Sequence, residues 1–184
     1  MAGVTLCNCF DGIANGTTVT TGNSGGASGA AWDTVTTGTG TTLASDNAHQ
    51  IHNGQALKIA TGASAQTPFV RWNTSLGTVT TCYWRVYAYW TGNPASTVNL
   101  IQFGVTGLSG FGAAVTITTA GKVQVLDTNS TQQIISTASI PLNTWFRLEG
   151  YVTGSATVGK AQLQCFFAGA DNTTPSETHT TGAT

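Results

Sequence analysis

The feature that most constrains the fold is a long alternating stretch from Thr78 to Trp90. Side chains at every second position of a strand share one face, and alternation of this kind predicts a half-buried β-strand. The face predicted to meet the core carries Thr80, Cys82, Trp84, Val86, Ala88 and Trp90. The opposite face carries Tyr83, Arg85, Tyr87 and Tyr89. The stretch therefore predicts a strand whose second face is aromatic and charged.

A second stretch, residues 144–153, divides in the same way. Its predicted core face carries Phe146, Leu148 and Val152, and its other face carries Trp145, Arg147, Glu149 and Tyr151. If the two strands were neighbours, Arg85 and Glu149 would pair across them. Two interpretations stay open: a structural ion pair under an aromatic cover, or a surface on which sugar rings stack. The candidate ligand-binding residues are Tyr83, Arg85, Tyr87, Tyr89, Trp145, Arg147, Glu149 and Tyr151.

Strands are expected along most of the remaining chain. Threonine makes up about one residue in five, and β-branched side chains favour strands over helices. Turn sequences at 120–121 and 127–130 predict two hairpins. The pattern predicts an all-β fold, a two-sheet antiparallel β-sandwich or jelly roll. The further predicted strands are 3–10, 55–61, 67–72, 98–105, 112–119, 122–127, 132–138 and 161–168.

The length of 184 residues fits one domain spanning 1–184. Residues 11–50 are rich in glycine and threonine, and they predict a long ordered loop with at most one short strand near 31–35. Residues 169–184 predict a polar C-terminal tail with little to bury.

Charge and hydropathy exclude several functions. Only 7% of the residues are charged and the net charge is -1, without any basic run, which argues against nucleic acid and anionic membranes as partners. No apolar run approaches the ~18 residues of a membrane span, and the first residues lack the basic and apolar regions of a secretion signal. A neutral, threonine-rich β protein is nevertheless typical of an extracellular location. Release by lysis within a virus particle would reconcile these observations, as would a signal or larger chain outside this sequence.

The four cysteines have no zinc-binding spacing. Cys82 and Cys165 fall on predicted core faces, where we expect free thiols that pack as small apolar groups rather than a disulfide. Cys7 and Cys9 would lie on one face of a strand, where they cannot easily bridge each other.

Catalytic patterns are not evident. A glycoside hydrolase needs two carboxylates close together, but no predicted strand presents two acids at alternate positions. Asp46, His49 and His52 have a spacing that a metal site could use, although the segment reads better as a polar loop leading into a strand. We therefore expect a non-enzymatic protein.

Two segments resemble a known family. The first contains Phe10-Asp11-Gly12, residues 16–20, residues 23–29 and Trp32-Asp33, and the second is Ile140-Pro-Leu-Asn-Thr-Trp-Phe-Arg-Leu-Glu149. Together with the strands between them they resemble the laminin-G-like, concanavalin A-like jelly rolls of actinobacterial and phage proteins. The resemblance implies two antiparallel sheets packed face to face, with rim loops that bind glycans or calcium in some members. No cofactor is expected, with calcium at Asp33 or Asp46 left as a weak alternative.

The resemblance also sets expectations for function. Such domains usually close with a last strand beside the first, whereas residues after Phe167 are polar. Either that strand is missing or a partner covers the open edge, so virion subunits or further copies of the chain are the expected partners, with cell-surface glycans as an addition. The predicted function is a lectin-like structural or adhesion component on a phage virion, in the capsid or the tail. The alternatives are a carbohydrate-binding module of a bacterial extracellular protein and, less favoured, a glycoside hydrolase.

Overall fold

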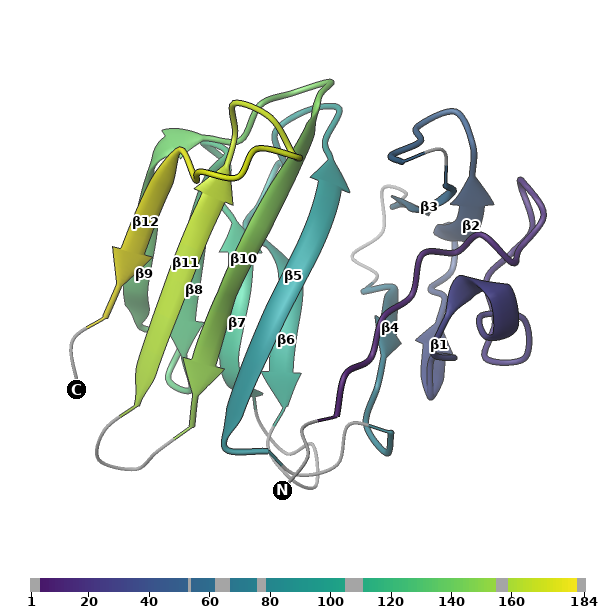
Figure 1. Cartoon of the computed structure of the whole chain (residues 1–184), viewed down its shortest axis with the longest axis horizontal. Coiled ribbons are helices and arrows are strands. Elements are labelled where there is room, and N and C mark those ends of the chain that lie inside the picture. The colour runs from purple at the N-terminus through teal and green to yellow at the C-terminus, as the bar shows by residue number, and fades with distance from the viewer. Residues whose placement is uncertain are drawn as a thin grey trace. The chain divides into compact units, whose positions relative to one another are not determined.

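The computed structural model describes residues 4–52, 54–61, 67–75, 79–104, 111–154 and 159–181. The chain groups into two compact units, Met1–Gly77 and Thr78–Thr184 (Figure 1). Its regular elements are strands, apart from one 3-10 turn at Gly26–Ser28, and all paired strands run antiparallel. The expected all-β class is confirmed for the described residues.

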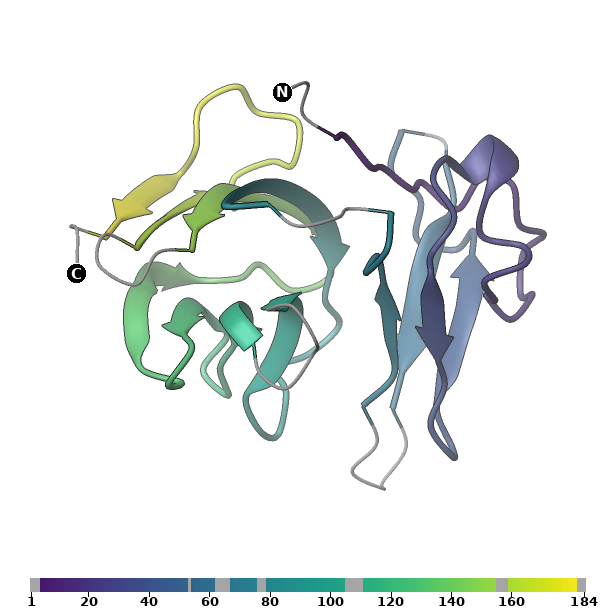
Figure 2. The same cartoon turned by 90° about the horizontal axis from the view of Figure 1, so that it is seen from below.

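The second unit contains two four-stranded sheets. The front sheet has the strand order β12-β11-β10-β5, and the back sheet has the order β6-β7-β8-β9. Figure 2 shows them as two layers. The front strands are β5 (Thr81–Tyr89), β10 (Trp145–Thr153), β11 (Lys160–Phe166) and β12 (Glu177–Thr180). The back strands are β6 (Val98–Gly104), β7 (Phe111–Ile117), β8 (Lys122–Asp127) and β9 (Gln132–Ser139).

One apolar core lies between these two sheets. Trp84 of the front sheet meets Phe103 of the back sheet with ring centroids 6.3 Å apart. Fully buried side chains come from both sheets, and each such aliphatic group contributes about 1.5–3 kcal/mol by leaving water. They include Val115, Ile117, Val123, Phe146, Leu148, Leu163 and Cys165. The alternation that defined the core faces thus produces a β-sandwich-like architecture.

Gly150 makes room for the largest of the core side chains on β5. It lies opposite Trp84 in the β10–β5 ladder. A Cβ atom at this position would overlap the carbonyl of Gln162 and stand 3.0 Å from the Trp84 ring. A glycine is therefore needed here for close strand approach rather than for an unusual backbone angle.

The first unit contains two short ladders. β1 (Thr34–Thr36) pairs with β4 (Phe69–Arg71), and β2 (Thr42–Asp46) pairs with β3 (Ala56–Ala60). Residues 16–19 add hydrogen bonds along β2, among them Val19 N–H to the Leu43 carbonyl at 2.9 Å. The small apolar centre of this unit consists of Ile13, Val19, Leu43 and Ala44.

Polar side chains organise the rest of the first unit. The Asn8 amide donates to the carbonyls of Ser24 and, at 2.9 Å, Ala30. Asp33 accepts the N–H groups of residues 73–75 at 2.7 to 3.0 Å. These hydrogen bonds join segments that are far apart in the sequence. They therefore fix the path of long loops that have no regular strand pairing.

Most predicted strands are confirmed to within a few residues, while three predictions need correction. The predicted strand 3–10 is wrong for residues 4–10, which form only an isolated bridge at Asn8. Its backbone pairs instead with the irregular segment at residues 28–30, where Cys9 N–H donates to the Ser28 carbonyl and Ala30 N–H donates to the Cys7 carbonyl. Residues 11–50 are more regular than the expected loop, because they contain β2 as well as β1 near the predicted short strand. The single-domain prediction for 1–184 stays a prediction, because two compact units need not fold independently.

The polar tail is the third correction. Residues expected to have little to bury include β12, which pairs with β11. The Glu177 carboxylate of β12 also accepts the N–H groups of Thr137 at 2.7 Å and Ala138 at 3.2 Å, both on β9. The tail thus covers the edge of β11 and links the two sheets. Pairing with backbone and a carboxylate, rather than apolar burial, orders this strand.

Candidate functional site

The side of the front sheet that points away from the sandwich core carries the candidate residues, and it is called the outer face here. The β10–β5 register places Trp145 opposite Tyr89, Arg147 opposite Tyr87, Glu149 opposite Arg85, and Tyr151 opposite Tyr83. Directly opposed residues share one face of a sheet. The structure therefore brings together all eight residues that the sequence predicted.

The predicted pair between Arg85 and Glu149 is confirmed. Arg85 Nε lies 2.7 Å from Glu149 Oε1, and Arg147 Nε lies 2.6 Å from the same oxygen. The Arg85 side chain is 60% exposed, whereas those of Glu149 and Arg147 are 19% and 9% exposed. One carboxylate is thus shared by two guanidinium groups, of which Arg85 alone is open to solvent.

Arg147 serves the structure of this face. Its guanidinium lies 3.7 Å from the ring centroid of Phe166 and 5.8 Å from that of Tyr87. It donates to the carbonyls of Ala170 and, at 2.8 Å, Asn172 in the loop after β11. Because both of its terminal nitrogens bind loop carbonyls and its Nε lies against Glu149, Arg147 holds that loop rather than reaching a ligand.

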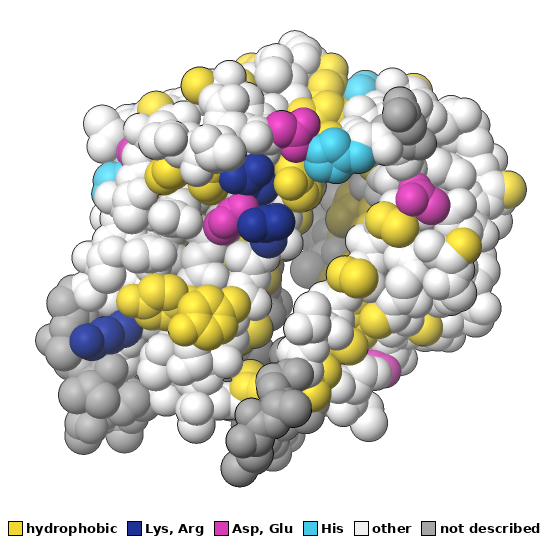
Figure 3. All heavy atoms as spheres, viewed as in Figure 1, with side chains coloured by type: hydrophobic (Ala, Val, Ile, Leu, Met, Phe, Trp, Pro, Cys, Tyr) yellow, Lys and Arg dark blue, Asp and Glu magenta, His cyan; other side chains and the backbone are white. Residues whose placement is uncertain are grey.

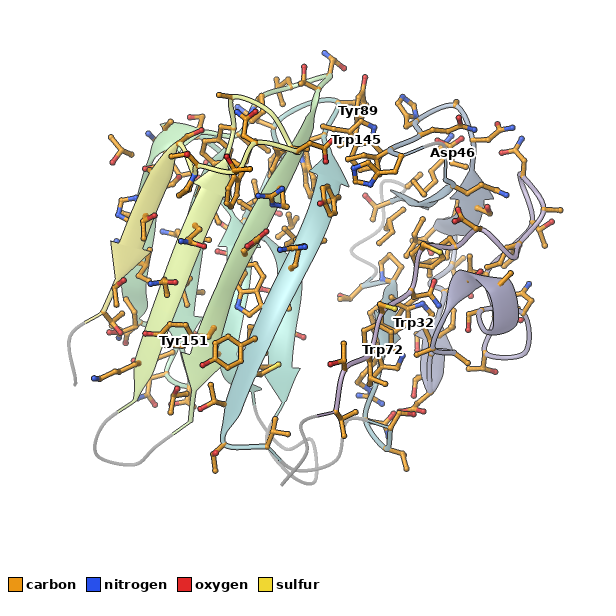
Figure 4. All side chains as sticks on the ribbon, viewed as in Figure 1. Trp32, Asp46, Trp72, Tyr89, Trp145 and Tyr151 are labelled. Carbon is orange, nitrogen blue, oxygen red and sulfur yellow. The ribbon has the colours of Figure 1, made fainter. Side chains whose placement is uncertain are left out.

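Two aromatic pairs lie at opposite ends of β5 and β10. Tyr83 and Tyr151 have ring centroids 5.7 Å apart with a tilted geometry, and Tyr83 is 78% exposed. Tyr89 and Trp145 meet edge to face, also at 5.7 Å. Figure 4 shows Tyr151 well apart from Tyr89 and Trp145 on these strands. Tyr83 is the exposed ring of these four, with Tyr151, Tyr89 and Trp145 half-buried, and Tyr83 and Tyr151 are called the tyrosine pair below.

Further polar residues on this face were not predicted as part of the site. Gln162 lies opposite Tyr151, Gln164 lies opposite Glu149, and Lys160 lies opposite Thr153, all from β11. The signal was available, since these three alternate with the buried Ala161, Leu163 and Cys165. The sequence analysis predicted the strand 161–168, but it did not assign the outward-facing side chains of that strand to the site.

The acids considered for calcium are engaged by hydrogen-bond donors. Backbone N–H and hydroxyl donors, above all those of Ser75, hold the pKa of Asp33 well below its ordinary value. The hydrogen bond with His49, 2.8 Å from Asp46, lowers the pKa of Asp46. Across the described ranges, no three His, Cys, Asp or Glu side chains lie close enough to hold a metal ion. The geometry favours anchoring roles for Asp33 and Asp46 over calcium binding.

The cysteines are free thiols. Cys165 is buried in the sandwich core, and this burial strongly raises the pKa of its thiol. Burial also raises the pKa of Cys82, which is partly exposed. The expectation that the thiol packs as a small apolar group is confirmed for Cys165, and Cys82 is a free thiol as expected but is only partly buried.

The first unit holds an aromatic stack that sequence reasoning missed. Trp32 and Trp72 stack with centroids 3.7 Å apart, and Phe10 lies 6.2 Å from Trp32. The two tryptophans are labelled side by side in Figure 4. The Trp72 indole donates to the Ala31 carbonyl at 2.8 Å, so the stack fastens β4 to the segment before β1.

Comparison with known proteins gives no match to a family model, a curated protein or a solved structure. Among the described residues, no helix has the length and apolar character needed to span a membrane.

Proposed function

We propose that this chain is a non-enzymatic, lectin-like jelly-roll protein that acts as a structural or adhesion component of a phage virion surface, in the capsid or the tail. The observation that carries the binding role is the tyrosine pair beside Arg85 on the outer face, with Tyr83 78% exposed. Flat aromatic rings next to fixed hydrogen-bond donors suit the faces of sugar rings. The virion placement rests on the family resemblance and on the low charge of the chain.

The state of the carboxylates supports a binding role over catalysis. Glu149 is held by two arginines, and Glu177 accepts two backbone N–H groups and lies 2.7 Å from His179 Nε2. A glycosidase needs one acid that stays protonated and a second that faces the sugar. Both of these glutamates are instead committed to structural partners.

The same tyrosine pair would also serve a carbohydrate-binding module of a bacterial extracellular protein, which is the second candidate. Mass spectrometry of purified phage particles distinguishes the two. Detection of the chain at a fixed copy number per particle is expected, and its absence from particles of the phage that encodes it would overturn the virion placement.

A glycan array tests the binding role. We expect a defined set of sugars to bind the unaltered protein, and binding to fall about tenfold or more for Tyr83→Ala, because a stacked aromatic contact is lost. Ile135→Ala is the matched control, since Ile135 is an exposed apolar residue of the back sheet. Retained binding in Tyr83→Ala, or equal loss in both variants, would contradict a site at the tyrosine pair.

A further inference from the structure

The basic residues of this chain are concentrated on the outer face. The chain has only six Lys and Arg residues, and Arg85, Arg147 and Lys160 all lie on this one face. Glu149 is the acid that the front-sheet strands place on this face, because Glu177 of β12 lies opposite the buried Cys165 and so belongs to the core side. Asp171 lies in the loop at residues 170–172 whose carbonyls bind Arg147. With Asp171 counted, three positive groups and two negative groups leave one positive charge there, although the whole chain has a net charge of -1.

Arg85 is paired with a carboxylate and is still available to a ligand. Its Nε lies 2.7 Å from Glu149 Oε1 as an ion pair, and 60% of the side chain is exposed. Among the described residues, no other partner engages its two terminal nitrogens. The planar guanidinium of an arginine carries parallel N–H donors, and their spacing matches the two oxygens of a carboxylate.

The tyrosine pair lies between two basic residues. Arg85 is two residues from Tyr83 on β5, and Lys160 lies opposite Thr153, two residues beyond Tyr151 on β10. Two such steps along a strand span about 13 Å. Figure 3 shows the basic and acidic groups of this face next to its hydrophobic patch, with a further basic group on the patch's other side. A ligand of more than one sugar ring is needed to reach both basic residues.

We infer that the outer face binds acidic oligosaccharides whose sugars carry carboxylate groups. One carboxylate pairs with the Arg85 guanidinium, the sugar ring stacks on Tyr83 and Tyr151, and a second negative group lies near the Lys160 ammonium. Gln162, opposite Tyr151, adds an amide within the same row for ring hydroxyls. This inference rests on the proposed sugar-binding role and adds the chemical class of the ligand.

The test compares acidic sugars with the same sugars after their charge is removed. Oligomers of galacturonate, glucuronate and mannuronate, and sialyl-lactose, are each immobilised as the free acid and as the methyl ester. We expect at least one acid to bind about tenfold or more tightly than its ester, because hydrogen bonds to a charged group are the strong ones. We also expect that binding to weaken as salt rises, since the basic residues are exposed.

Single substitutions identify which basic residue binds the carboxylate of the sugar. Arg85→Gln is expected to abolish the preference for the acid over the ester, and Lys160→Gln to reduce it. Lys58→Gln is the matched control, because it changes the net charge equally at an exposed residue of β3 in the first unit. A preference that survives in Arg85→Gln, or that falls equally in Lys58→Gln, overturns the inference.

The array also separates this inference from the proposed function. Equal binding to acids and esters, lost in Tyr83→Ala, would retain the sugar-binding role and overturn the acidic ligand class. Binding to none of the acids, their esters or neutral sugars would overturn both.

Discussion

The two units of this chain reach an ordered structure by different means. The second unit buries aliphatic and aromatic side chains between two sheets, with Phe146, Leu148 and Leu163 fully inaccessible to water. The first unit relies on side chains such as Asn8 and Asp33, each of which binds several backbone groups. Apolar burial is shared by many neighbours, whereas a polar anchor is directional and acts at one place. The units should therefore differ in how they respond to single substitutions and to acid.

The largest expected effect is a cavity in the sandwich. Leu148→Ala should lower the free energy of unfolding by about 2–5 kcal/mol, because the lost burial adds to the cost of the cavity. Denaturant unfolding followed by tryptophan fluorescence measures the change. Leu142→Ala is the control, since Leu142 is 41% exposed and should change stability by less than about 0.5 kcal/mol. Equal effects of the two variants would contradict the assigned core.

A smaller and local effect is expected in the first unit. Asn8→Ala removes a side chain that binds the Ser24 and Ala30 carbonyls and the Phe10 N–H, with a cost of about 1–3 kcal/mol for the unmet groups. Hydrogen exchange measured by peptide should show faster exchange around residues 24–30 and unchanged protection in β10. Asn129→Ala, at an exposed turn, is the control. Loss of protection in both units would show that they do not respond separately.

Acid should produce the smallest of the three effects and distinguish the units by pH. Burial raises the pKa of Glu177, but hydrogen bonds from His179 and the N–H groups of Thr137 and Ala138 outweigh it, so the pKa is lowered below its ordinary 4.5. The unfolded state then binds the proton more readily, and stability that is fully present above about pH 4.5 is lost as the pH falls through the lowered value. Asp33, lowered further, should lose its contribution at still lower pH.

Hydrogen exchange at a series of pH values checks this order. Peptides covering β9 and β12 should lose protection before the turn at residues 73–75. In Glu177→Gln the loss near β12 should no longer depend on pH in this range. Earlier loosening of the turn held by Asp33, or an unchanged pH response in Glu177→Gln, would show that these carboxylates do not control the two regions.

The second unit could be predicted from the sequence better than the first, and the reason is this difference between apolar burial and polar anchors. Alternation in β5 and β10 predicted the strands, their buried faces and the contact of Arg85 with Glu149, because a period of two leaves few alternatives for register. The first unit has no such period. Its anchors, such as Asp33 with Ser75, join residues 42 apart through hydrogen bonds that leave no pattern in sequence. β12 was missed for a related reason, since Glu177 acts through backbone groups of β9.

The β5–β10 ladder has a consequence for how the second unit folds. β6 to β9 pair in chain order through short connections, whereas β10 must return to β5, so that Thr81 meets Thr153 across 72 residues of sequence. Closing so long a loop costs entropy before any contact stabilises it. We expect the back sheet to form early and the β5–β10 closure to limit the folding rate. The outer face would then be assembled last, when the sequence that separates its two halves has already folded.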